Sequence, residues 1–124
     1  MYDILADVKT ALAAVSGVKT CRIGIENGLS PDDYPIIRVV PRRVEPGAAI
    51  TRRNITVLVY FGLPVSEADG GLEAVYSALC DMADSIRYAM DAATAFCATW
   101  QDTDFDEDQI EYFKLGVSRF LVVA

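Results

Sequence analysis

The sequence contains no histidine, and this absence excludes several kinds of chemistry together. Serine–histidine and cysteine–histidine nucleophilic catalysis, histidine-ligated metals and imidazole acid–base catalysis all need that side chain. Only three cysteines are present, Cys21, Cys80 and Cys97, and none of them has CxxC spacing. This odd number without a motif predicts free, buried thiols in a reducing compartment.

Long apolar runs are also missing. No stretch approaches the roughly 20 apolar residues of a membrane span. The first residues, Met1-Tyr2-Asp3, have neither the basic region nor the apolar core of a signal peptide, so we expect none. The chain has 124 residues, of which 52% are apolar and 23% charged. We therefore expect one globular domain, residues 1–124, that buries a core without a disulfide or a metal.

Basic residues are few and unevenly placed. The net charge is −7, which makes general affinity for nucleic acid a poor prediction. The stretch from Lys19 to Arg53 has seven basic and four acidic residues, whereas the remainder has four basic and fourteen acidic ones. A polarised surface favours oriented docking onto charged partners or onto copies of the same chain. A solubilising acidic surface with scattered arginines is the alternative.

Apolar periodicity predicts two helices and five strands in the order α-β-β-β-α-β-β. The expected helices are 3–16 and 72–90, and the expected strands are 18–25, 35–40, 54–61, 96–101 and 112–123. The turn residues between them are Asn27-Gly28, Ser30-Pro31-Asp32-Asp33 and Asp69-Gly70-Gly71. Consecutive strands with short connections predict an α+β fold with one antiparallel sheet of about five strands and two amphipathic helices on one of its faces.

The strand 54–61 has apolar residues on both sides. Ile55, Val57, Val59 and Phe61 alternate with Asn54, Thr56, Leu58 and Tyr60. Because two helices cover only one face of a sheet, the face with Leu58 and Tyr60 stays uncovered. Ile36, Val40, Phe120 or Val122 join it, depending on the register. Such a face is too apolar for water, so we predict that the chain associates with itself through it.

Two arginine pairs, Arg42-Arg43 and Arg52-Arg53, flank a predicted loop centred on residues 45–49. If the neighbouring strands pair, four guanidinium groups gather at one end of a hairpin and can dock onto an acidic surface. The loop centre has little apolar surface with which to pack. We therefore expect the loop to be mobile in the isolated chain and ordered in an assembly. A solvated loop base is the alternative interpretation.

The acidic segment from Asp102 to Glu111 fits a calcium loop poorly. An EF-hand starting at Asp102 requires glycine where Glu107 stands and glutamate where Phe113 stands, and a start at Asp104 fails as well. A solvated hairpin tip is the preferred interpretation. No nucleophile or oxyanion donor accompanies these carboxylates in the sequence, so we expect no catalytic residues, no metal and no cofactor. Trp100 is expected to be a core or interface anchor.

The order of elements resembles that of the tail-terminator and tail-completion proteins of long-tailed bacteriophages, the family of lambda minor tail protein U. The resemblance covers essentially the whole chain and has no signature motif. It rests on a helix ending before Gly17-Val18, the strand 35–40 with a long loop after it, the strand 55–60 before one long amphipathic helix, and the end Phe120-Leu121-Val122-Val123. It implies a structural protein without catalytic residues. In that family a homohexameric ring caps the tail tube, stops its polymerisation and presents a surface to the head connector.

The resemblance also implies the partners and the location. These are other copies of the chain, the tail tube protein and the head–tail connector, in a virion tail assembled in the bacterial host cytoplasm. No membrane and no sequence-specific nucleic acid is expected. The candidate interface residues are Arg42, Arg43, Arg52, Arg53, Leu58 and Tyr60. The alternatives are another phage neck or head–tail joining protein, a small-molecule-binding regulatory domain of ferredoxin-like type, and a small hydrolase using Asp102, Asp104 and a metal.

Overall fold

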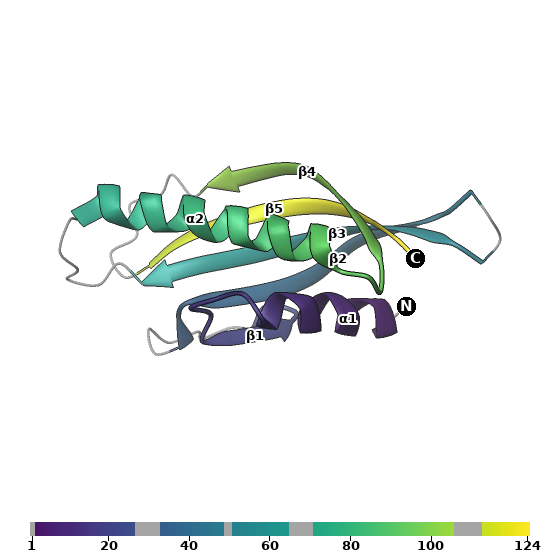
Figure 1. The fold of residues 1–124 in the computed structure, drawn as a ribbon, viewed down its shortest axis with the longest axis horizontal. Coiled ribbons are helices and arrows are strands. Elements are labelled where there is room, and N and C mark those ends of the chain that lie inside the picture. Colours follow the sequence, from purple (N-terminus) through teal and green to yellow (C-terminus); the bar gives the residue numbers. More distant parts are fainter. Residues whose placement is uncertain (1, 27–32, 49–50, 65–70, 106–112) are drawn as a thin grey trace.

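A computed structural model describes residues 2–26, 33–48, 51–64, 71–105 and 113–124 (Figure 1). The helices are α1 (Tyr2–Ala13) and α2 (Gly71–Ala92), and the strands are β1 (Thr20–Ile23), β2 (Ile36–Pro46), β3 (Arg53–Pro64), β4 (Cys97–Phe105) and β5 (Phe113–Val123). The order of elements agrees with the prediction. The turns predicted at Asn27-Gly28, Ser30 to Asp32 and Asp69-Gly70, together with the acidic residues 106–111, lie outside the described residues.

The sheet is mixed, so the prediction of an antiparallel sheet is wrong. Its strand order is β1-β2-β3-β5-β4, and β1 runs parallel to β2 while the other three pairs are antiparallel. Twelve residues, 24–35, connect β1 to β2. A connection of about a dozen residues is long enough to return the chain to the end of the sheet where it began. The turn residues in this segment indicated a break in the chain but carried no information about the direction of the next strand.

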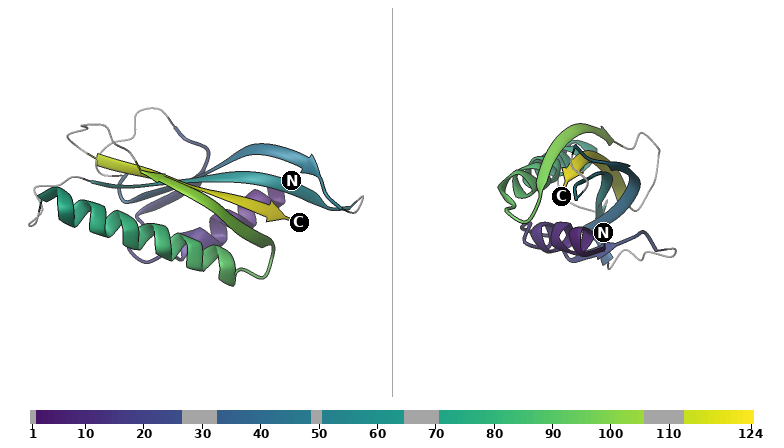
Figure 2. Two further views of the ribbon diagram at one scale, coloured as in Figure 1. Left: turned by 90° about the horizontal axis from the view of Figure 1, so that it is seen from above. Right: turned by 90° about the vertical axis from the view of Figure 1, so that its right-hand side faces the viewer.

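Both helices pack against the same face of the sheet, as the three views of the ribbon agree (Figures 1 and 2). Each helix presents a stripe of apolar residues at helical spacing, and each central strand presents every second residue. The buried members of this core include Leu5, Val8, Leu12, Ile37, Val39, Ile55, Val57, Val59, Phe61, Leu79, Ile86, Met90, Phe120 and Val122. Full burial of one such side chain stabilises the fold by about 1.5–3 kcal/mol. Neither described helix combines the length and apolar character that crossing a membrane requires.

Two glycines have different structural roles in this fold. Gly17 adopts φ of 85°, a left-handed conformation that suits the turn after α1. Gly116 of β5 instead leaves room for a ring, because a Cβ there would lie 2.5 Å from the nearest ring atom of Phe61. The Phe61 ring in turn meets Phe105 edge to face, with 6.2 Å between the ring centroids. The sheet and the aromatic core therefore depend on the missing side chain at this position.

Strands β2 and β3 are longer than predicted and form a hairpin that extends past both helices (Figures 1 and 2). Their pairing runs from Ile36–Gly62 to Pro46–Arg53, and near the tip the Gly47 N–H donates to the Arg52 carbonyl at 3.0 Å. The prediction of a loop from Arg42 to Arg53 is therefore wrong for residues 42–46 and for Arg53, which belong to the strands, whereas residues 47–48 and 51–52 lie outside the strands as predicted. Pairing of Arg43–Pro46 with Arg53–Thr56, which apolar periodicity does not reveal, orders this segment as a two-stranded ribbon. We call residues 42–48 and 51–53 the arm.

Candidate functional site

The sheet face opposite the helices carries a half-buried apolar surface. Leu58 and Tyr60 lie on it, because their neighbours Val57 and Val59 are fully buried in the core on the other side of β3. Further half-buried residues stand in register with this face of β3, namely Val40 on β2 and Leu115, Val117, Leu121 and Val123 on β5. We call this surface the open face.

The register decides which of the other candidates join Leu58 and Tyr60. Ile36 and Val40 lie on the open face, whereas Phe120 and Val122 belong to the core beneath the helices. Arg119 stands directly opposite Leu58. One of its terminal nitrogens lies 3.5 Å from Asp102, while its Nε is enclosed without a hydrogen-bond partner among the described residues. The open face thus combines apolar side chains with one incompletely paired guanidinium group.

Arg38 is a buried cation that sequence reasoning missed. It stands among the apolar residues of β2 on the side opposite the core, yet it is only 1% exposed. Its Nε donates to Glu26 at 2.6 Å, and its Nη1 donates to the carbonyl oxygens of Thr20 and Ile37 at 3.1 and 2.9 Å. Nη2 donates to the Thr20 hydroxyl at 3.0 Å. Because a buried charge needs such partners, a lone arginine within an apolar strand was the available signal.

The contacts of Arg38 change the acidity of its neighbours. Its hydrogen bond lowers the pKa of the Glu26 carboxyl below the ordinary value, and Arg22 adds to the effect from 3.1 Å. Burial raises the pKa of the Tyr34 hydroxyl and that of the Cys21 thiol, and it outweighs the Arg38 charge, which acts to lower both pKa values. Cys21 is therefore mostly a thiol at neutral pH, which is the less nucleophilic form. The cluster ties β1 and the residues after it to β2.

The four predicted arginines lie on the arm and are all exposed. The two pairs do not meet directly, since Arg43 stands opposite Thr56 and Arg53 stands opposite Pro46. The pairs are therefore about three residues, or roughly 10 Å, apart along the hairpin. Arg43 contacts Glu45 at 3.1 Å in an exposed ion pair. Within the described ranges, the other three arginines form no ion pair, so the arm offers free guanidinium groups to a partner.

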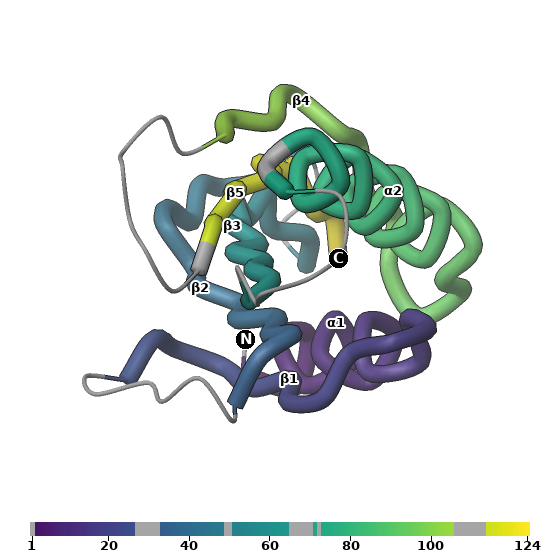
Figure 3. Tube along the Cα trace, turned by 90° about the vertical axis from the view of Figure 1, so that its left-hand side faces the viewer, coloured from purple at the N-terminus to yellow at the C-terminus, as the bar shows by residue number. Residues whose placement is uncertain are grey.

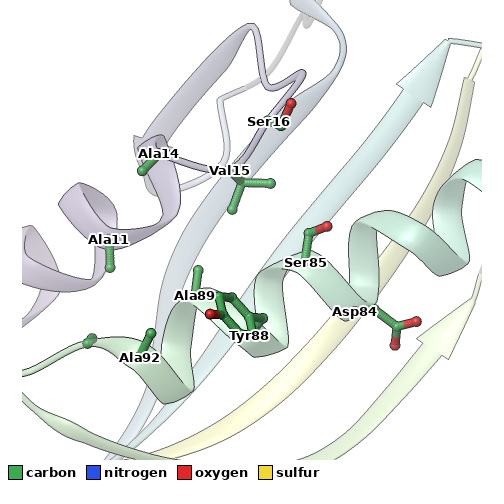
Figure 4. A pocket seen from close by; sticks show the side chains of 10 residues that line it. Ala11, Ala14, Val15, Ser16, Asp84, Ser85, Tyr88, Ala89 and Ala92 are labelled. Carbon is green, nitrogen blue, oxygen red and sulfur yellow. The ribbon is translucent and has the colours of Figure 1, made fainter.

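A groove between α1 and α2 is a second feature that sequence reasoning missed (Figure 4). It holds about 760 Å³ and is lined by Ala11, Ala14, Val15, Ser16, Asp84, Ser85, Tyr88, Ala89, Ala92 and Ala93. Its floor is made of small side chains, and the Tyr88 side chain beside it is 76% exposed. A smaller hollow of about 210 Å³ adjoins it, shares Ser16 and Ser85, and is lined by Asp81. Two aspartates and no lysine or arginine therefore stand among the described residues that line these hollows.

The cysteines are free, but the prediction that they are buried is wrong for two of them. Cys80 is exposed because it follows the core residue Leu79 on α2 and so points to another side of the helix. Cys97 is exposed at the start of β4, an edge strand of the sheet. Cys21 alone is half-buried, against the core.

Trp100 lies at the edge of the helical side rather than inside the core. It is 37% exposed, and the guanidinium carbon of Arg87 lies 4.3 Å from the centre of its ring. Its Nε1 donates to the Thr103 hydroxyl at 2.9 Å, which in turn lies 2.8 Å from the Ser118 hydroxyl. Trp100 therefore joins α2 to β4 through a cation–π contact and a short polar chain.

Asp102 and Asp104 belong to strand β4 and not to a loop. Asp102 stands opposite Arg119 and Asp104 opposite Val117, which places both on the open-face side of the edge strand. In the part of the chain that the structure describes, no three acidic or cysteine side chains gather as a metal site would require.

The described residues thus form three surface features, the open face, the arm and the groove, together with the buried cluster of Arg38. A comparison with protein-family models gives no match to this chain, and a comparison with curated proteins gives none either.

Proposed function

We propose that this chain is a structural protein of a bacteriophage or prophage tail, a terminator that assembles into a homohexameric ring on the end of the tail tube. The observation that carries the proposal is the open face, an apolar surface on one side of a sheet whose other side is covered by both helices. It is supported by the resemblance in element order over the whole chain and by the arm, which extends away from the body.

The open face gives the proposed ring a set of half-buried apolar side chains to cover. Leu58 and Tyr60 lie at its centre, flanked on one side by β2 and on the other by β5. Half-buried apolar side chains in a continuous patch gain free energy when a second protein surface removes them from water. We assign this face to contact between copies of the chain, and the arm continues the same face outward.

The mechanism of such a protein is geometric. Contacts that join two different patches on successive copies are heterologous, and they close into a ring when the rotation between copies fits. A ring that matches the last disc of the tube on one side, and lacks tube-subunit contacts on the other, stops further growth of the tube. Its outer side then serves as the contact for the head connector.

Two measurements test the proposal. Native mass spectrometry of the purified chain is expected to give six copies per particle. Electron microscopy of tails assembled without this chain is expected to show tubes of uncontrolled length, and adding the chain is expected to restore a uniform length. Uniform tails in the absence of the chain would contradict the proposed role.

Measurements on the same purified chain distinguish the alternative functions. A monomer or dimer whose melting temperature rises with a small ligand would support a regulatory ligand-binding domain, although the ferredoxin-like order β-α-β-β-α-β differs from the order found in this chain. Stabilisation by a divalent metal, lost in an Asp104→Asn variant, would support the metal-dependent hydrolase. A ring that binds the connector but leaves tube length unchanged would support another neck protein.

A further inference from the structure

We infer that the arm of one copy lies in the groove between α1 and α2 of the next copy. The inference rests on the proposed self-assembly and adds to the open face two further patches that contact each other in it, the arm and the groove. The groove is a surface that neither the resemblance nor the sequence patterns pointed to.

Charge is the first reason for this pairing. The arm carries Arg42, Arg43, Arg52 and Arg53 against a single acidic residue, Glu45. The groove and the adjoining hollow present Asp84 and Asp81 and no basic residue among their described lining. Opposite charges on two surfaces of one chain favour contact between copies in one orientation and disfavour arm-to-arm contact.

Shape and polarity give the second reason. Between its arginines the arm exposes Val44, which is 41% exposed, and Pro46. The groove floor offers alanine side chains that allow a backbone to approach closely, and about 760 Å³ is enough for several side chains. A small apolar patch bordered by cations therefore faces a small apolar floor bordered by carboxylates.

The Tyr88 ring gives the third reason. Its side chain is 76% exposed at the groove, so the ring is accessible to a side chain of another copy. A guanidinium group stacks favourably on such a ring. The chain already contains one contact of this kind, between Arg87 and Trp100 at 4.3 Å.

The arm cannot occupy the groove of its own chain. Paired backbone holds it in line with β2 and β3, and it points away from the helices, past the ends of both (Figures 1 and 2). The end view in Figure 3 places the groove-forming helices on one side of the sheet. Arm and groove are thus two different patches, and contact between them is heterologous, as a ring requires.

A charge-reversal experiment tests the inference. One variant carries Arg52→Glu and Arg53→Glu in the arm, and a second carries Asp81→Arg and Asp84→Arg at the groove. Each is expected to weaken self-association, measured by sedimentation, on the order of 100-fold, because each places like charges in contact. A chain with all four changes, or an equal mixture of the two variants, is expected to restore association to within about tenfold of the parent.

Matched controls have the same change of net charge away from both patches. Lys9→Glu with Lys19→Glu controls for the arm variant, and Asp3→Arg with Glu73→Arg controls for the groove variant. Both controls are expected to associate like the parent. Thermal unfolding verifies that each variant is folded, and the milder pairs Arg52→Ser with Arg53→Ser and Asp81→Asn with Asp84→Asn replace any that is not.

The outcomes separate this inference from the proposed function. If folded arm or groove variants associate like the parent, or if the fourfold change does not rescue, the inference is overturned while a hexameric terminator still stands. If reversal and rescue occur but tails need no terminator, the arm–groove contact holds and the tail function falls. A parent chain that stays monomeric at about millimolar concentration overturns the contact itself, and tail microscopy then decides the function independently.

Discussion

Between residues 57 and 60 both faces of strand β3 are apolar in sequence, but their environments differ greatly. Val57 and Val59 are fully buried beneath the helices, whereas Leu58 and Tyr60, one residue along, are only half-buried on the open face. The open face nevertheless includes Arg38, whose charged group is almost completely enclosed. Hydrophobicity alone therefore does not tell the face that the helices cover from the face that they leave open.

The largest expected effect comes from placing one charge on each face in turn. Val57→Asp puts a carboxylate into the core without a partner, and we expect a loss of more than about 4 kcal/mol of unfolding free energy, or no folded protein. Leu58→Asp is expected to leave each chain folded and to shift the protein from larger to smaller oligomers. Chemical denaturation and sedimentation measure the two results. If Leu58→Asp unfolds the chain, the open face is part of the core.

The next effect concerns Arg38, whose charged group is almost completely buried on the open side. Arg38→Met leaves the carbonyl oxygens of Thr20 and Ile37 without their donor, and we expect a loss of about 2–3 kcal/mol. Arg38→Lys keeps the charge but not the planar fork, so it should recover only part of that loss. Arg22→Met is the matched control, since this exposed arginine contacts the same Glu26. Equal losses from Arg38→Met and Arg22→Met in urea denaturation would contradict the assignment of Arg38 as the anchor.

Alanine substitutions at two glycines compare how tightly the two faces of the sheet are packed. At Gly116 a Cβ would meet the fully buried Phe61 ring at 2.5 Å, so Gly116→Ala is expected to cost about 1–3 kcal/mol. At Gly62 a Cβ would meet the end of the half-buried Leu115 side chain, also at 2.5 Å, which can turn away, and the buried Tyr34 ring at 3.0 Å. We expect a smaller loss there than at Gly116, of about 1 kcal/mol. Thermal unfolding of the two variants side by side checks the order, and a larger loss at Gly62 would show that the open face is the more tightly packed.

The smallest effect is a dependence on pH. The folded state lowers the pKa of the Glu26 carboxyl through the Arg38 hydrogen bond. The stabilisation of the fold by the Glu26 carboxylate is therefore present above the ordinary pKa of about 4.5, and it is lost as the pH falls through the lowered pKa. The difference in unfolding free energy between the parent and Glu26→Gln should be largest near pH 7 and should shrink below about pH 4.5. A difference that stays constant down to pH 2 would mean that the Glu26 charge does not stabilise the fold.

Local patterns determined the number, type and order of the elements in this protein. The stripe on α2 and the alternation in β3 identified their buried residues because side-chain burial follows the period of the backbone. Leu58 and Tyr60 were placed on the side away from the core for the same reason. The arginine pairs were identified as candidates from their spacing around Glu45 and Pro46, although that segment was assigned to a loop.

Only the tertiary structure decided how distant segments meet. The parallel pairing of β1 with β2, the length of the hairpin and the cluster around Arg38 depend on hydrogen bonds between residues far apart in the chain. The groove depends on two helices separated by more than fifty residues, so no local pattern brings Ala11 to Ala89. Periodicity reports which side of an element is buried, whereas the partner that buries it is chosen by the free energy of the whole packed chain.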